Sequence, residues 1–233
     1  MALVDHGDDL WTWEAPLRYL GVAMGRRMAI MHLGDEGLLV HSPAPLTDEL
    51  RAALDGLGEL RIVAAAGSLH GHAHMGDYRR GYPAARLLGT PELARNRSDL
   101  DFDQILAGTG AVDANGEVLA TPFEGHRMLD ELEFFHPASR TLITGDLCFN
   151  VGPDWPLPVR LFANGPRLRR RLGPTPLFRS NVEDVDAARA SVERILEWDF
   201  DRVLPGHGDI VEAGGRELVR AELLPRFTSA EAA

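Results

Sequence analysis

Short apolar runs alternate with amphipathic segments along this chain. Residues 27–33 and 37–41 predict two paired strands, because both runs are largely apolar and a Gly-Asp-Glu turn separates them. A helix is predicted directly after Thr47, which is a favourable N-cap, and the helix is expected to end at Gly56 or Gly58. The first part of the chain therefore has the mixed character of an α/β protein.

The rest of the chain continues this alternation. The longest predicted helix has apolar residues at helical spacing, and one hairpin is predicted around a Pro-Ala-Ser turn. A length of 233 residues is enough to bury one large core, so a single domain over residues 1–233 is expected. The further predicted elements are strands at residues 60–66, 85–88, 131–135, 141–144 and 201–204, and helices that begin at residue 91 and span residues 182–198 and 215–224.

Three histidines, His70, His72 and His74, follow the predicted strand at residues 60–66. In an extended segment, residues two apart point to the same side, so these imidazoles can converge on one point. Imidazole is a common metal ligand and suits zinc or iron. A polar surface loop is the alternative for such a run.

Three more possible ligands stand at strand ends. His126 follows Gly125 and a strand-like segment, Asp146 follows the strand at residues 141–144, and His207 lies in a Pro-Gly turn after residues 201–204. Ligands in α/β folds collect at the carboxyl ends of strands. The predicted metal ligands are therefore His70, His72, His74, His126, Asp146 and His207.

The order of these motifs resembles the metallo-β-lactamase superfamily. The carrying motifs are HxHx, GH, a strand that ends in GD, and PGHG, between residues 70 and 208. The resemblance implies a four-layer αββα sandwich that holds one or two zinc ions, with iron as the alternative metal. The chain is also similar to a poorly characterised branch of that superfamily, through residues 13–18, 25–28, 40–43 and 134–142.

The chain departs from the HxHxDH motif of that superfamily, whose Asp binds the second metal and holds the attacking water. His74 stands at the Asp position and Met75 at the last His position; alternatively the Asp is deleted and His74 fills the last His position. The carboxylate is missing in both alignments, so a second metal is expected to be weakly bound or absent. Asp77 is a weak catalytic candidate, because an acid at such a position is more often a helix N-cap or first-turn residue than a catalytic group.

The resemblance implies a metal-bound hydroxide that attacks a small-molecule ester, lactone or thioester. Two alternatives stay open: a metal-binding protein without catalysis, which the missing Asp favours, and a mononuclear iron oxygenase. No motif names the substrate, and residues 150–180 are expected to line the pocket.

Composition limits the partners. The net charge of −11 opposes nucleic-acid binding, and no stretch approaches 18 apolar residues, so no membrane span is expected. The run from Arg167 to Arg171 is either an anion clamp or a solvated helix face. The single cysteine, Cys148, is expected to be a buried, inert thiol. One cysteine suits a reducing compartment, and the N-terminus has no basic, apolar leader, so the cytoplasm is the expected location. A small-molecule substrate is the expected partner, and the oligomeric state stays open.

Overall fold

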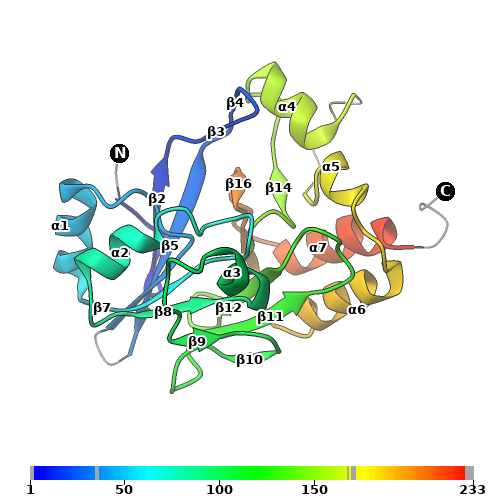
Figure 1. The fold of residues 1–233 in the computed structure, drawn as a ribbon. Coiled ribbons are helices and arrows are strands. Elements are labelled where there is room, and N and C mark those ends of the chain that lie inside the picture. The colour runs from blue at the N-terminus through cyan, green and yellow to red at the C-terminus, as the bar shows by residue number, and fades with distance from the viewer. Residues whose placement is uncertain (1–2, 35–36, 167, 169–171, 229–233) are drawn as a thin grey trace.

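The computed structural model describes residues 3–34, 37–166, 168 and 172–228 (Figure 1). The run from Arg167 to Arg171, interpreted above as an anion clamp or a solvated helix face, lies mostly outside the described residues, which include only residue 168 of the five. Cys148 is buried and is a free thiol. None of the described helices has the length and apolar character of a membrane span.

Two β-sheets form the middle of the molecule. One has seven strands in the order β1-β2-β5-β6-β7-β8-β9, and the other has five in the order β10-β11-β12-β13-β15. The strands of the first sheet are β1 (Leu3–Asp5), β2 (Leu10–Ala15), β5 (Arg26–Leu33), β6 (Gly37–His41), β7 (Glu59–Ala64), β8 (Arg86–Gly89) and β9 (Gln104–Ile105). Those of the second are β10 (Gly110–Ala111), β11 (Leu119–Phe123), β12 (Glu131–His136), β13 (Thr141–Ile143) and β15 (Arg202–Leu204).

A shared apolar core joins the inner faces of the two sheets. Met31 and Ile62 of the first sheet pack in one cluster with Leu132, Phe134 and Leu204 of the second. Side chains alternate across a strand, so the neighbours of these residues face outward and need cover. The helices supply that cover.

Helices cover the outer face of each sheet. The first sheet packs against α1 (Asp48–Leu57), α2 (Met75–Gly81) and α3 (Pro91–Asn96), and the second against α6 (Val185–Ile195) and α7 (Gly215–Leu223). In Figure 1, α1 and α2 lie on the opposite side of the molecule from α6 and α7. The four-layer αββα sandwich of the α/β class is confirmed.

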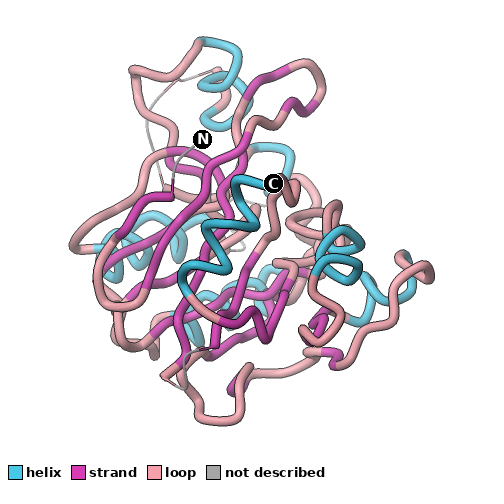
Figure 2. Tube along the Cα trace, turned by 90° about the vertical axis from the view of Figure 1, so that its left-hand side faces the viewer, coloured by secondary structure: helices cyan, strands magenta, loops and turns pink. Residues whose placement is uncertain are grey.

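Small elements stand beyond the sandwich at the end that carries the predicted ligands. They are the hairpin of β3 (Arg18–Tyr19) and β4 (Val22–Ala23), the parallel pair of β14 (Phe149–Asn150) and β16 (His207–Gly208), and the helices α4 (Leu157–Asn164) and α5 (Pro176–Arg179). The hairpin and α4 rise together at the top of Figure 1 and of the turned view in Figure 2. A short 3-10 turn, Leu224–Arg226, follows α7.

Most local predictions agree with these bounds. Thr47 caps α1, accepting a hydrogen bond from the Leu50 N–H at 3.2 Å, and Gly58 follows the end of that helix. The predicted longest helix is shorter than expected, because Asp184 caps it and α6 begins only at Val185. The strand predicted at residues 60–66 ends at Ala64, so the chain leaves the sheet before the histidine run.

Candidate metal centre

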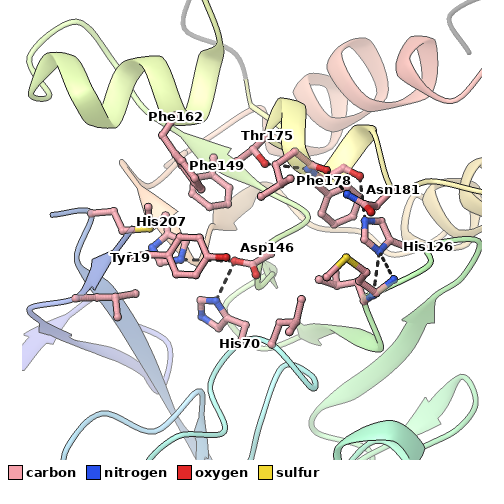
Figure 3. Close-up of a pocket in the computed structure, with 16 residues that line it drawn as sticks. Tyr19, His70, His126, Asp146, Phe149, Phe162, Thr175, Phe178, Asn181 and His207 are labelled. Atoms are coloured by element: carbon pink, nitrogen blue, oxygen red, sulfur yellow. Dashed lines mark hydrogen bonds and ion pairs between the residues drawn. The ribbon is translucent and has the colours of Figure 1, made fainter. Parts of the chain in front are cut away.

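His70, Asp146 and His207 come together at one place, and each follows the carboxyl end of a strand (Figure 3). One nitrogen or oxygen ligand atom from each lies within 4.8 Å of the other two. Asp146 Oδ1 lies 3.2 Å from His70 Nδ1 and 3.6 Å from His207 Nε2. Within the described ranges this is the one group of three or more such side chains with this spacing.

Glycines allow the ligand loops to approach closely. Gly71 has φ +79°, and a Cβ there would lie 2.5 Å from Ser42 Oγ. A Cβ on Gly206 would lie 2.6 Å from the Gly145 carbonyl oxygen and 2.9 Å from His70 Cε1. A larger residue at position 206 would therefore separate the PGHG turn from the other two ligand loops.

The buried Glu131 organises two of the three loops. Its carboxylate accepts hydrogen bonds from the N–H groups of Gly145 at 3.1 Å, Asp146 at 2.8 Å and Leu147 at 2.9 Å. The main chain beside it pairs with the start of the His70 loop, since residue 132 donates to the carbonyl of residue 66 at 2.7 Å. Burial, together with the nearby Asp146 charge, raises the pKa of Glu131.

Arg27 holds the third loop. Its guanidinium donates to the carbonyls of Pro205 and Gly208, each at 2.8 Å, and pairs with Glu14 at 2.6 Å. The motifs of the sequence predict no role in the site for Arg27 or Glu131. The available signal was a charged residue within an apolar strand, which is uncommon unless the charge is paired.

The protonation of His207 suits a metal ligand. Its Nδ1 lies 2.8 Å from the Gly25 carbonyl oxygen, which can only accept, so Nδ1 carries the proton. Burial lowers the pKa of His207 and favours the neutral ring, which leaves the Nε2 lone pair toward Asp146. Such a hydrogen bond on the far nitrogen is typical of metal-binding histidines.

Asp146 is held as a carboxylate. Burial opposes its ionisation, but the imidazoles of His207 and His70 beside it outweigh burial and keep the pKa of Asp146 well below its usual range. At His70 burial acts to lower the pKa, and the hydrogen bond and charge of Asp146 raise it overall. Two imidazoles and one carboxylate form a donor set that fits zinc or another transition metal.

His72 and His74 do not join this cluster. The chain turns at Gly71 and starts α2 at Met75, so residues two apart no longer share a side, and the expected convergence of the three imidazoles does not occur. Arg97 donates to the His72 carbonyl at 2.9 Å and lies 3.4 Å from its Nδ1. His74 precedes α2, and its Nδ1 lies 3.3 Å from Asp77 Oδ2.

Met75 and Asp77, which follow the three histidines, both have structural roles. Met75 is fully buried in the core between α2 and the first sheet. Asp77 lies in the first turn of α2 and pairs with Arg80 at 2.6 Å, which agrees with the first-turn interpretation of this acid.

His126 lies near the cluster, but both of its nitrogens are engaged elsewhere. Its Nδ1 accepts from the N–H groups of Met128 at 3.1 Å and Leu129 at 2.9 Å, and its Nε2 donates to the Phe178 carbonyl at 3.0 Å (Figure 3). The ring packs on Phe178 with a centroid distance of 4.3 Å. In this arrangement His126 forms part of the wall beside the three ligands.

No protein-family model and no curated protein matches this sequence. Solved structures do. A metallo-β-lactamase from Pontibacter korlensis is 14% identical at a TM-score of 0.68, over 98% of this chain and 99% of that chain. The metallo-β-lactamase FIM-1 from Pseudomonas aeruginosa, in its mono-zinc form, is 11% identical at 0.66, over 100% of this chain and 96% of that chain.

A third similar structure is a flavodiiron core, as its name states, and not a β-lactamase. The Flv1 flavodiiron core from Synechocystis sp. PCC6803 is 13% identical at a TM-score of 0.66, over 97% of this chain and 60% of that chain. At these identities the likeness establishes the architecture, which here spans nearly the whole chain. The protein therefore has the metallo-β-lactamase fold.

Proposed function

We propose that this protein is a metal-dependent hydrolase in which His70, Asp146 and His207 hold one transition-metal ion, with zinc as the first candidate. The observation that carries the proposal is the spacing of their ligand atoms, all within 4.8 Å of one another in side chains that line a cavity. Catalytic zinc sites use three protein ligands and leave one position open to water.

A zinc ion bound there would supply hydroxide near neutral pH, because it lowers the pKa of its water to about 7. The chain's own groups prepare this site. The Gly25 carbonyl fixes the ring of His207, Glu131 fixes the Asp146 loop, and the Asp146 carboxylate offsets part of the positive charge. The proposed substrates are small molecules with an ester, lactone or thioester carbonyl.

A single ion is favoured over two. Among the described residues, His72, His74 and His126 have other partners, and the carboxylate of the HxHxDH motif is missing. Two dications about 4 Å apart repel strongly and need anionic ligands between them. Asp146 is the one carboxylate of the cluster.

An iron-dependent redox enzyme is the second candidate. Two histidines and one carboxylate form the ligand set of many mononuclear non-haem iron enzymes. The likeness to a flavodiiron core supports the compatibility of this fold with iron. A metal-binding protein without catalysis remains the alternative of a different class. For any of these, we propose the cytoplasm as the location, because the one cysteine of the chain suits a reducing compartment.

Metal analysis of the purified protein tests the ligand set. Wild type is expected to bind one equivalent of metal, and His70→Ala, Asp146→Asn and His207→Ala are expected to lower its affinity more than tenfold. His74→Ala and His72→Ala are matched controls, because these histidines lie in the same loop region outside the cluster. Equal loss in the controls, or full occupancy in the three ligand variants, would contradict the assignment.

The identity of the metal and a hydrolysis assay separate the three candidates. Zinc that restores cleavage of nitrophenyl acetate or a simple lactone to chelated protein would support the hydrolase. Iron as the bound metal, with no hydrolysis in the zinc form, would favour the redox enzyme. Tight metal binding with neither activity would favour the non-catalytic protein.

A further inference from the structure

The cavity above His70, Asp146 and His207 has a volume of about 210 Å³ (Figure 3). One of its walls is a continuous row of aromatic rings. Tyr19 on β3 contacts Phe162 on α4 at a centroid distance of 5.9 Å, Phe162 contacts Phe149 at 6.1 Å, and Phe149 contacts His207 at 4.7 Å. This row leads from the surface to the proposed metal ligands.

Aliphatic side chains also contribute to the rim of the cavity. Leu69, Met128 and Leu177 all line the cavity, yet they are 53%, 50% and 52% exposed. Tyr19 at the outer end of the aromatic row is 47% exposed. A gathering of exposed apolar side chains around one opening marks a binding site more often than a neutral surface.

The polar groups of the lining are few and mostly occupied. Thr175 caps α5, accepting a hydrogen bond from the Phe178 N–H at 3.1 Å, and both nitrogens of His126 are engaged. Among the described residues that line the cavity there is no arginine or lysine, and Asp146 is the one carboxylate. An anionic group would therefore meet a carboxylate and no guanidinium inside the cavity.

We propose that the substrate of this site is an uncharged ester, lactone or thioester that carries an alkyl chain of medium length. The hydrolysable carbonyl rests on the proposed function, whereas the uncharged alkyl group is argued from the lining alone. A cavity of about 210 Å³ is large enough for several methylene-sized groups. The alkyl chain of the substrate would lie between the aromatic row and the aliphatic rim.

Methyl alkyl ketones test this inference, because they present a neutral carbonyl and an alkyl chain but are not hydrolysed. Calorimetric titration of the full chain, as purified and after chelation, should give an affinity that rises from methyl propyl to methyl heptyl ketone. The expected gain is about fourfold per methylene, the value for burial in an apolar site. Decanoate should bind the chelated protein more weakly than the ketone of matched length.

Variants of the rim residues show where the alkyl chain of the ketone binds. Met128→Asp and Leu177→Asp should each weaken the long ketone at least tenfold and leave the short ketone nearly unchanged. Ile105→Asp is the control, because Ile105 is a similarly exposed apolar residue on β9 that is not part of the lining. Thermal unfolding of each variant shows that the fold is intact.

The outcomes distinguish the two proposals. If the protein binds no metal ion at all but shows the chain-length dependence, the alkyl site is supported and the hydrolase is contradicted. Metal binding with no dependence on chain length, or an equal effect of Ile105→Asp, would overturn the alkyl site alone. Binding to phosphatidylcholine vesicles that Met128→Asp abolishes, with no chain-length dependence, would assign the rim to a lipid surface and also overturn it.

Discussion

Glu131 is buried and accepts three backbone hydrogen bonds from residues 145–147, so it sets the position of Asp146 without lining the cavity. Glu131→Gln turns one acceptor oxygen into a donor that faces an N–H group. We expect a loss of about 1–3 kcal/mol in the free energy of unfolding. A loss of about 10–100-fold in metal affinity is also expected, as for other groups that orient metal ligands. Urea unfolding and metal titration measure the two effects.

Glu133 provides a matched control on the same strand. It is buried like Glu131, and burial with the Glu131 charge raises its pKa well above the usual range, which favours its neutral form. Glu133→Gln therefore preserves both shape and charge and should change metal affinity little. If the two variants gave the same metal affinity, the positioning role of Glu131 would be wrong.

His41 gives the fold a dependence on pH. Burial lowers its pKa from 6.5 to about 3, so between these values the unfolded chain takes up a proton that the folded chain does not. The stability present above pH 6.5 is therefore lost as the pH falls toward about 3. From neutral pH to about two units lower, the loss from this one group is about 2 kcal/mol.

The variant His41→Leu isolates this effect from the other histidines. Its free energy of unfolding should fall less steeply on acidification than that of wild type, by about 2 kcal/mol over the same interval. Urea unfolding at the two pH values measures the difference. Parallel pH profiles for wild type and variant would show that another group is responsible.

At the scale of elements, the start of α6 decides how the second sheet is covered. Asp184 caps this helix, accepting a hydrogen bond from the Ala187 N–H at 2.9 Å. Asp184→Ala should lower the free energy of unfolding by about 1 kcal/mol, a fall of about 2–4 °C in Tm for a chain of this size. Asp186→Ala, two residues further on in the first turn of the helix and without a capping bond, should lower it by only about 0.3–1 kcal/mol. Calorimetry that showed equal effects would contradict the capping role.

The element scale also explains what the sequence could predict. Apolar spacing located the strands that surround the core and the caps such as Thr47, because these depend on neighbouring residues. It placed Asp146 and His207 at strand ends, where they are found together. These predictions needed only local sequence and the rule that strand ends gather ligands.

The directions of the other histidines depend on distant residues. His126 is held by the Phe178 carbonyl, 52 residues later, and His72 by Arg97, 25 residues later. Gly71 takes a positive φ that ends the extended geometry assumed for the histidine run. Since no local pattern records these contacts, the sequence overestimated the number of converging imidazoles.

At the scale of the whole molecule, the net charge of −11 leads to a prediction about nucleic acid. Affinity for duplex DNA depends on phosphate neutralisation, so binding at physiological salt should be weaker than about 10⁻⁴ M. Fluorescence anisotropy with a labelled duplex measures it. Salt-sensitive micromolar binding would contradict the prediction and draw attention to the run from Arg167 to Arg171, most of which lies outside the described residues.

The three proposed ligands come from both halves of the sandwich. His70 follows a strand of the seven-stranded sheet, whereas Asp146 and His207 follow strands of the five-stranded sheet. A bound ion would therefore act as a cross-link across the seam between the sheets as well as a reagent. At a ligand concentration of one hundred times Kd, such binding adds about 2.7 kcal/mol to the stability of the native state. Metal binding should slow amide hydrogen exchange most along this seam and should change it little at the ends of the outer helices.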